Sequence, residues 1–526
     1  MIDFPIDIWS IKKFGIEKWH KNFYWPVSIK EYDDIFDEII ESYMNLIKNS
    51  PPDIADALWA LYKQVKGISL LFSTHLAIHR LQQKNYKIIY HSSSIYYRSI
   101  LEGKIIDTIN LKPLPKMPSL KNRLKSKIKA LIRNFENHII YPGLLLNRFT
   151  DSTYITTDTR KESNEQFKKF MVSTGKKHVV IPDYHFLVSN PKYNKLQKIV
   201  QENITIFLDN LEKIAVKYDV GIKKDEADNL NNLILNSIQF IKDYIHAMTF
   251  KLPSNRKTFL LVQKQGTTFD RCLCIAAKRK GYRAIGFSHG NYIGAFKARN
   301  TDYVLLGAVD TFVTSNKDSA ELFKNSVDTF LNPYNKEVTI VSFQKGNNKH
   351  FMKMKKQYRN KPISSINKVM VLEDGIAHHY FPWAYQLELN LSIARTLQKY
   401  KIKSVLKKHP ELLKESDGVY DNFYDEFLED PFEITYMNAD AYIIQHIGTT
   451  AFGIALMTNR PIIIFDYILD MLWDKPAELL RKRCRVIPSW IDEDSNKIMF
   501  DEYKLIEALQ KPLEEINDEF INKYML

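Results

Sequence analysis

The chain of 526 residues contains only three cysteines and no long apolar run. Cys272, Cys274 and Cys484 lack the spacing of a zinc site or a disulfide framework, so we expect reduced, structural thiols in a cytoplasmic protein. No stretch of about 18 uncharged apolar residues occurs, which predicts that the chain does not span a membrane. Residues 1–10 carry two aspartates and neither a basic nor a long apolar segment, so we expect no signal peptide.

Motifs for metal and nucleic-acid binding are also missing. No Asp-x-Asp motif lies at the end of a predicted strand, and Asp492-Glu493-Asp494 falls in a polar stretch that predicts a solvated loop. We therefore expect a reaction that needs no metal and no cofactor. Basic residues are not interleaved with aromatic residues along any pair of predicted strands, so we expect no nucleic-acid partner.

The composition is that of a globular protein with an excess of positive charge. Hydrophobic residues make up 45% of the chain, charged residues 26%, and the formal net charge is +14. A basic surface attracts phospholipid headgroups, nucleic acid or a phosphorylated substrate, and charge alone does not distinguish these partners. A chain of this length is expected to fold as two or three domains.

Strand and helix patterns alternate in two parts of the chain, as in parallel α/β domains. In the first part, strands are predicted at Phe259–Val262, Arg283–Phe287 and Tyr303–Gly307, with a helix at 269–280 that ends before Gly281. In the second part, strands are predicted at 368–372, 404–407, 441–444 and 461–465, with helices at 384–399 and 450–457. The predicted fold class is α/β, with two Rossmann-like domains facing a cleft and helical additions in the N-terminal half.

The predicted domain boundaries follow changes in composition along the chain. We expect an N-terminal domain at 1–345 with a helical insertion near 113–255, a linker at 346–366, a C-terminal domain at 367–505 and a C-terminal helix at 506–526. Within the insertion, residues 121–135 place lysines and arginines opposite an apolar stripe. This pattern predicts either a packed helix with a solvated face or a helix that lies on an anionic membrane surface.

Three polar loops follow predicted strands of the C-terminal domain. They are Glu373-Asp374-Gly375, His409-Pro410 and Gly448-Thr449-Thr450. In open α/β sheets, ligands bind outside the carboxyl ends of the strands. The three loops therefore predict a nucleotide site.

Each loop carries groups that suit phosphate or sugar chemistry. The imidazole of His409, next to Lys407, can donate a hydrogen bond to a phosphate or protonate a leaving group. The hydroxyls of Thr449 and Thr450 at a helix start can bind an anion, although Thr449 also fits an ordinary N-cap. Asp374 can act as general base on a sugar hydroxyl, although Asp-Gly is also a common turn pair.

The N-terminal domain has a similar loop at Ser288-His289-Gly290, directly after a predicted strand. The glycine allows the backbone to approach a ligand closely. His289 is expected to face the cleft from the side opposite His409, which makes it a second candidate base.

The acidic pair, the His-Pro and the hydroxyl pair together resemble the motif set of bacterial sialyltransferases and polysialyltransferases, which have the GT-B fold. The resemblance implies that Asp374 is the base, that His409 assists the departing CMP phosphate, and that Thr449 with Thr450 binds that phosphate. Those enzymes commonly have Ser-Ser or Ser-Thr where this chain has Thr-Thr.

The strand, helix and strand that lead to His289-Gly290 resemble capsule Kdo transferases and CDP-glycerol glycerophosphotransferases. In the latter family a His-Gly histidine and a His-Pro histidine are the functional pair, which would make His289 the base. Those enzymes usually have an aromatic residue or Gln before the His-Gly, and this chain has Ser288. The resemblances cover roughly Phe259–Asp466 and leave the base open between Asp374 and His289.

Together the resemblances imply an inverting, metal-independent glycosyltransferase that moves sialic acid, Kdo or a related acidic sugar from a CMP donor to a glycan or lipid-linked glycan of the cell surface. The nucleotide and its phosphate would contact Lys407, His409, Gly448, Thr449 and Thr450. The acceptor side, which includes the N-terminal domain, would be lined by Ser288, Gly290, Glu373 and Gly375.

Two other functions stay open from the sequence. One is a CDP-alditol phosphotransferase of the same fold, and the other is a non-catalytic basic protein that binds anions or nucleic acid. The expected location is the cytoplasm, with peripheral contact to the inner face of the cytoplasmic membrane as a further hypothesis.

Overall fold

The computed structural model of the protein describes residues 2–92, 95–102, 153–156, 177–180, 198–222, 224–252, 258–262, 267–288, 293–297, 305–314, 316–329, 338–342, 349–359, 365–373, 383–409, 413–511 and 516–526.

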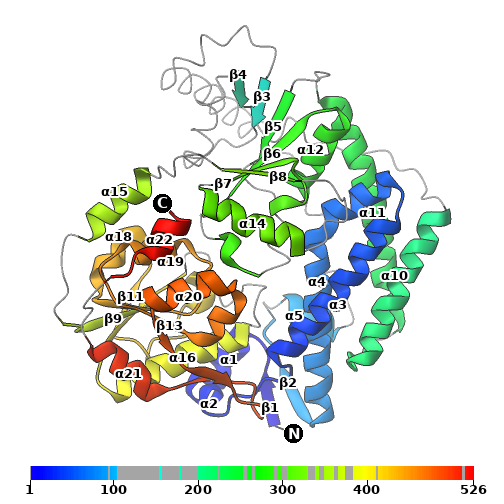
Figure 1. The fold of residues 1–526 in the computed structure, drawn as a ribbon. Coiled ribbons are helices and arrows are strands. Elements are labelled where there is room, and N and C mark those ends of the chain that lie inside the picture. The colour runs from blue at the N-terminus through cyan, green and yellow to red at the C-terminus, as the bar shows by residue number, and fades with distance from the viewer. Residues whose placement is uncertain are drawn as a thin grey trace, which may run out of the picture.

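Two parallel sheets, each with six strands in the described residues, form the centres of two α/β domains (Figure 1). The N-terminal sheet has the order β4-β3-β5-β6-β7-β8 and consists of β3 (Thr153–Thr156), β4 (Lys177–Val180), β5 (Thr258–Val262), β6 (Arg283–Phe287), β7 (Thr311–Thr314) and β8 (Thr339–Ser342). The C-terminal sheet has the order β11-β10-β9-β12-β13-β14 and consists of β9 (Lys368–Leu372), β10 (Lys403–Lys407), β11 (Glu426–Leu428), β12 (Ala441–Ile444), β13 (Ile462–Phe465) and β14 (Arg485–Ile487).

The central strands of the C-terminal sheet are apolar along their whole length. The sequences Ala-Tyr-Ile-Ile of β12 and Ile-Ile-Ile-Phe of β13 are buried at every position. Continuous apolar runs are typical of parallel strands, because helices cover both faces of such a sheet. The covering helices include α16 (Trp383–Lys399), α19 (Thr450–Met457) and α20 (Asp474–Arg483).

The strand order of each sheet reverses at one point. Numbered along the chain, the C-terminal sheet has the order 3-2-1-4-5-6 of a Rossmann fold and reverses between β9 and β12. The N-terminal sheet reverses between β3 and β5. The crossover connections diverge at such a point, which leaves space for a ligand at the carboxyl ends of the two strands.

Long helices pack together on one side of the N-terminal domain (Figure 1). They are α3 (Ile29–Asn49), α4 (Pro52–Gln83), α10 (Lys198–Lys217) and α11 (Lys224–Lys251), and α4 and α11 also contact α12 (Thr268–Arg279). The N-terminus of α3 is fixed by a capping box, in which Ser28 and Glu31 each accept a hydrogen bond from the other's backbone. Arg80 of α4 then pairs with Glu31 at 2.7 Å, which ties the two helices together.

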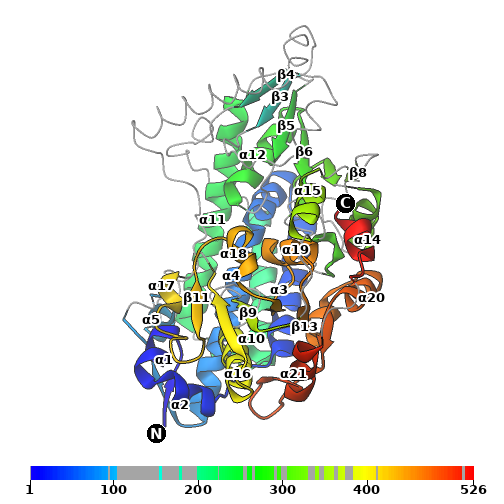
Figure 2. The same cartoon turned by 90° about the vertical axis from the view of Figure 1, so that its left-hand side faces the viewer.

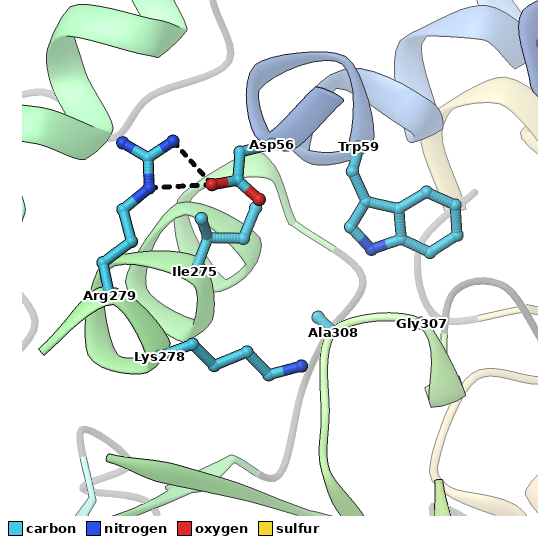
Figure 3. Close-up of a pocket in the computed structure, with 7 residues that line it drawn as sticks. All are labelled: Asp56, Trp59, Ile275, Lys278, Arg279, Gly307 and Ala308. Atoms are coloured by element: carbon cyan, nitrogen blue, oxygen red, sulfur yellow. Dashed lines mark hydrogen bonds and ion pairs between the residues drawn. The ribbon is translucent and has the colours of Figure 1, made fainter. Parts of the chain in front are cut away.

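The α4 helix joins the N-terminal sheet through a buried tryptophan. The Trp59 ring lies against the backbone of Gly307 so closely that a Cβ there would be 1.7 Å from Trp59 Cζ2 (Figure 3). The fully buried guanidinium of Arg271 on α12 donates to the Trp59 carbonyl oxygen at 2.8 Å. The helices and the sheet of this domain therefore share one core.

The first residues of the chain pack on the C-terminal domain. They form β1 (Ile2–Pro5), α1 (Ile8–Phe14) and α2 (Ile16–Lys21), and β1 pairs with β2 (Tyr86–Ile89) outside both large sheets. His20 Nδ1 lies 2.9 Å from a carboxylate oxygen of the buried Glu388 on α16, and the Trp25 N–H donates to the Ser495 oxygen at 3.0 Å.

The C-terminus returns to the N-terminal domain (Figures 1 and 2). The helix α22 (Glu519–Tyr524) contacts α14 (Lys317–Thr329), where the Ser319 hydroxyl donates to the Tyr524 oxygen at 2.9 Å. Just before α22, Asp518 pairs with Lys355 and Arg359 at the end of α15 (Lys349–Tyr358). The two domains are thus joined at both ends of the chain.

The remaining described elements lie outside the two large sheets. They are α5 (Ile95–Leu101), α17 (Leu413–Ser416), α18 (Phe432–Thr435), α21 (Glu502–Gln510), the short helices η3 (Ile293–Ala295), η4 (Tyr436–Asn438) and η5 (Asp466–Met471), and the antiparallel pair β15 (Ser489–Ile491) and β16 (Ile498–Phe500). No helix among the described residues combines the length and apolar character needed to cross a membrane.

The fold-class prediction is confirmed, since the protein has two Rossmann-like domains with helices added in the N-terminal half. The predicted strand at Tyr303–Gly307 is wrong over its described residues 305–307, because Leu305 and Leu306 are helical and the strand of this region is β7 at Thr311–Thr314. A short apolar run fits a buried helical segment as well as a strand, and the helical Leu306 is buried.

The domain boundaries stay predictions, although the structure adds detail to them. The range 113–255 that was expected to be a helical insertion contains β3 and β4 of the N-terminal sheet as well as α10 and α11. The expected linker at 346–366 contains α15. The basic segment 121–135 lies outside the described residues.

Candidate functional site

The three polar loops of the C-terminal domain begin at one level of the sheet. Leu372, the last residue of β9, is paired with Lys407 of β10 on one side and with Ile444 of β12 on the other. The next residues, Glu373, Lys408 and Gln445, therefore leave the sheet side by side. Because the strand order reverses between β9 and β12, this is the position where an open α/β sheet binds its ligand.

The first two loops are connected by a hydrogen bond. The backbone N–H of His409 donates to Glu373 Oε2 at 2.8 Å, and the backbone N–H of Glu373 donates to the Lys407 oxygen at 3.0 Å. Glu373 is only 5% exposed, and its Oε1 has no hydrogen-bond partner within the described residues. Burial raises the pKa of Glu373 to about 7, although the His409 N–H and the nearby lysines oppose this shift.

The two lysines before His409 are buried rather than solvated. Lys407 donates from Nζ to the backbone oxygen of Lys408, and desolvation lowers the pKa of Lys407. Lys408 Nζ lies 3.4 Å from the carboxylate of Glu429 and 5.1 Å from the centre of the Phe427 ring. Both lysines add positive potential below the strand ends, and direct contact of Lys407 with a phosphate stays a prediction.

The third loop leads into the N-terminus of α19. Thr449 is the N-cap, and its side chain accepts a hydrogen bond from the Phe452 N–H at 3.2 Å. Thr450 is exposed at the first helical position, and Gly448 is exposed beside the half-buried His446. A Cβ at position 448 would be 2.6 Å from His446 Nε2, so glycine lets the ring lie against the loop. The helix start places partial positive charge at the same sheet edge.

The N-terminal domain brings its own strand ends toward this edge. The loop after β6 and the loop after β13 both leave the carboxyl ends of their strands, and they pair with each other. The contacts are a bridge between Phe296 and Leu472, a hydrogen bond from Lys297 N–H to Met471 O at 2.8 Å, and one from Trp473 N–H to Ala295 O at 2.9 Å. The carboxyl edges of the two sheets therefore lie on the facing sides of the two domains.

Several predicted site residues lie outside the described residues. These are Asp374, Gly375, His289 and Gly290, so the choice of base between Asp374 and His289 stays open. Ser288, which precedes His289, is buried, and its N–H donates to the Val313 oxygen at 2.9 Å. This hydrogen bond extends the pairing of β6 with β7 by one residue toward the facing edge.

Three buried polar residues beneath the loops were not predicted from the sequence. Gln445 follows β12 as Glu373 follows β9, and its Nε2 donates to Asn390 Oδ1 on α16 at 2.6 Å. The fully buried Tyr420 lies close enough for its hydroxyl to lower the pKa of Glu373. The position of Gln445 at a strand end was a usable signal. Nothing in the sequence around Asn390 or Tyr420 distinguishes them from core residues.

A further cavity lies elsewhere in the described residues. It has a volume of about 220 Å³ and lies between α4, α12 and the turn at Gly307 and Ala308 (Figure 3). Its two basic side chains already have acidic partners, since Arg279 pairs with Asp56 and Lys278 Nζ lies 3.2 Å from Asp310. The cavity therefore offers no unpaired cation for a phosphate.

Metal binding at the candidate site can be examined only for the described residues. In the described part of the chain, no group of three or more His, Cys, Asp or Glu side chains is arranged to hold a metal ion. A metal-independent reaction stays a prediction.

Two Rossmann-like domains whose carboxyl edges face each other define the general class of the protein as a GT-B-like α/β protein. No protein-family model matches the chain. No curated protein matches it either. Among solved structures, UDP-N-acetylglucosamine 2-epimerase from Rickettsia bellii is similar over 71% of this chain and 92% of that chain, with 10% sequence identity and a TM-score of 0.33. A likeness this distant says nothing about the reaction, and the fold rests on the sheet topology.

The stability of the protein is expected to depend on the charge of Glu373. The ordinary pKa of 4.5 is raised to about 7 by burial, so between these values the folded protein holds a proton that the unfolded chain has lost. The protonated Glu373 carboxyl contributes its full share of stability below pH 4.5, and this share is lost as the pH rises through about 7. Glu373→Gln should therefore raise the free energy of unfolding by about 1–3 kcal/mol at pH 8 and by much less at pH 5. Urea unfolding at the two pH values measures this difference, and equal effects at both would contradict it.

Proposed function

We propose that the protein is an inverting, metal-independent glycosyltransferase that moves an acidic sugar from a CMP donor to a surface glycan. The acidic sugar would be sialic acid, Kdo or a relative, and the acceptor a glycan or a lipid-linked glycan. The proposal is supported mainly by one observation. The loops after β9, β10 and β12 begin at aligned positions of the sheet, where the strand order reverses.

The phosphate of the donor would bind between His409 and the N-terminus of α19. Thr449 shapes this helix start as its N-cap, and the exposed hydroxyl of Thr450 adds a donor at the first helical position. The buried Lys407 and Lys408 lie below the loop and favour an anion above it. Hydrogen-bond donors fixed in advance stabilise charge that develops on a leaving phosphate, and this is a large catalytic effect.

In the proposed reaction the acceptor oxygen forms a bond to the anomeric carbon while the bond from that carbon to the CMP phosphate oxygen breaks. The electron pair of the broken bond leaves with CMP, and His409 donates a hydrogen bond or a proton to the phosphate. The proton of the acceptor hydroxyl goes to the base, which is Asp374 or His289. Attack from the side opposite the leaving group inverts the anomeric configuration.

A CDP-alditol phosphotransferase is the second candidate, and one observation favours it. The loop that follows His289 pairs with residues 471–473 of the C-terminal domain, next to the carboxyl edge that carries His409. This pairing supports a reaction in which one histidine acts from each domain. The formal net charge of +14 suits an anionic acceptor or membrane surface in both candidates.

The identity of the donor is tested by measuring nucleotide release from CMP-sialic acid, CMP-Kdo, CDP-glycerol, CDP-ribitol and UDP-sugars. We expect release of CMP from one of the CMP-sugars and a loss of about 100-fold or more in kcat for His409→Ala, because a group that serves the leaving phosphate is removed. His246→Ala is the matched control, since that histidine is exposed on α11.

Release of CMP from a CDP-alditol alone would favour the second candidate. Release from a UDP donor alone would contradict both candidates. An RNA mobility shift that weakens with salt, with no turnover of any donor, would favour a nucleic-acid-binding protein.

Variants of the two threonines distinguish helix capping from phosphate binding. Thr449→Val removes the acceptor of the Phe452 N–H and should cost about 1 kcal/mol of stability. Thr450→Val removes an exposed hydroxyl and should leave the melting temperature unchanged while it raises the donor KM about fivefold or more. Thermal unfolding and donor-saturation kinetics on both variants measure these effects. An unchanged donor KM in Thr450→Val would show that only the cap matters.

A further inference from the structure

A buried polar cluster lies directly beneath the point where the strand order of the C-terminal sheet reverses. It contains Glu373 from the end of β9, Gln445 from the end of β12 and Asn390 from α16, which are 5%, 4% and 0% exposed. Gln445 Nε2 donates to Asn390 Oδ1 at 2.6 Å, and Glu373 Oε2 accepts the His409 N–H at 2.8 Å. The cluster thus lies below two of the three loops of the candidate site.

Two tyrosines close the cluster from the segment between α17 and β11. The Tyr424 hydroxyl donates to the Asn390 backbone oxygen at 3.0 Å. The Tyr420 hydroxyl lies close enough to the Glu373 carboxyl and the Asn390 side chain to interact with both. Tyr420 and Tyr424 are both buried.

Three polar atoms in this cluster have no hydrogen-bond partner among the described residues. They are Glu373 Oε1, Gln445 Oε1 and the Tyr420 hydroxyl by strict hydrogen-bond geometry, although Glu373 and Tyr420 lie close enough to interact with each other. Buried polar side chains lower stability unless they form hydrogen bonds, so the hydrogen bonds that this cluster makes are important for its stability. In Glu373 the second oxygen of the same carboxyl holds the backbone of His409. The Glu373 carboxyl thus links the end of β9 to the start of the His409 loop.

We propose that Glu373 is a positioning residue for His409, and that its carboxyl holds the His409 backbone firmly when ionised and loosely when protonated. The inference rests on the proposed function, because it assigns to His409 the phosphate of the donor. An ionised carboxylate accepts a stronger hydrogen bond from an N–H than a neutral carboxyl does. Loss of the proton from Glu373 to solvent would therefore tighten the start of the His409 loop.

Charged and titratable groups face this carboxyl from each element packed against it. Lys407 and Lys408 of β10 favour the ionised form, as do the His409 N–H and the Tyr420 hydroxyl, while burial opposes it. Tyr424 faces the carboxyl from the same segment as Tyr420, and Lys407 in turn faces Glu433, Asp430 and Glu429. With these opposing effects, the pKa of Glu373 is raised to about 7.

The test begins without substrate, so that it stands apart from the proposed function. Glutamate carboxyl carbons and histidine amides are followed by NMR between pH 5.5 and 8.5 in the wild type and in variants. We expect the Glu373 carboxyl and the His409 amide to titrate together with a midpoint near 7, and the amide to lose this step in Glu373→Gln.

Protonation of the His409 imidazole also moves its own amide signal, so a pair of tyrosine variants separates the two effects. Tyr420→Phe removes a hydroxyl that lowers the pKa of Glu373 and should shift the common midpoint upward. Tyr424→Phe removes a hydroxyl that is bonded to the Asn390 backbone instead, and should leave the midpoint in place. A His409 amide that ignores the ionisation of Glu373 would overturn the proposal, whatever the enzyme turns over.

Kinetics with the donor supply the second measurement. Wild-type kcat should rise about tenfold as the pH increases through the Glu373 midpoint, because each pH unit below it lowers the ionised fraction up to tenfold. Glu373→Gln keeps an acceptor oxygen for the His409 N–H and should lose this pH dependence, while Glu373→Ala should lose about tenfold or more in kcat with little change in donor KM.

The combined outcomes distinguish the two proposals. Equal kcat values for wild type and folded Glu373→Ala would overturn the positioning role. Coupled NMR titration in a protein that turns over no donor would support the positioning role and contradict the proposed function.

Discussion

The candidate site depends on the parallel pairing of β9 with both of its neighbours at one level. Leu372 is opposite Lys407 on one side and Ile444 on the other, so three loops start from one row of the sheet. A shift of one residue in either pair would turn the end residue of that strand to the other face. The apolar residues of β9, β10 and β12 are buried, as is typical of parallel strands that are covered on both faces.

Beneath this row the protein gives up stability to keep polar groups buried. Glu373 and Lys407 are both nearly inaccessible to solvent. Burial raises the pKa of Glu373 and lowers the pKa of Lys407, which favours the neutral form of each. Apolar side chains at these positions would give a more stable core. Proteins keep buried ionisable groups with shifted pKa values mainly at functional sites, where these groups take part in binding or catalysis. The pairing of the loops after β6 and β13 directs the facing domain to the same place.

Much of the C-terminal domain could be predicted from the sequence. The strands β9 and β12 and the helix α19 match the predicted residues, since a buried parallel strand is a short apolar run between turn residues. The same reasoning failed for the strand predicted at Tyr303–Gly307, since its described residues Leu305 and Leu306 are helical.

The strand order and the links between loops could not be predicted, because they are non-local. Glu373 meets His409 across 36 positions of the chain, and Gln445 meets Asn390 across 55. The three loops were visible as motifs, and their common level became visible only from the register. The buried cluster that connects them had no pattern in the sequence, because its members come from a helix, a turn and two strand ends.

The central claim is that the reversal point of the C-terminal sheet binds the nucleotide of the donor. Its most direct test is a crystal structure of the protein with CMP. We expect CMP at the carboxyl ends of β9 and β12, with its phosphate against the N-terminus of α19 and within hydrogen-bond distance of His409. CMP bound only in the cavity beside Trp59, or only at the N-terminal sheet, would show that the nucleotide site lies elsewhere.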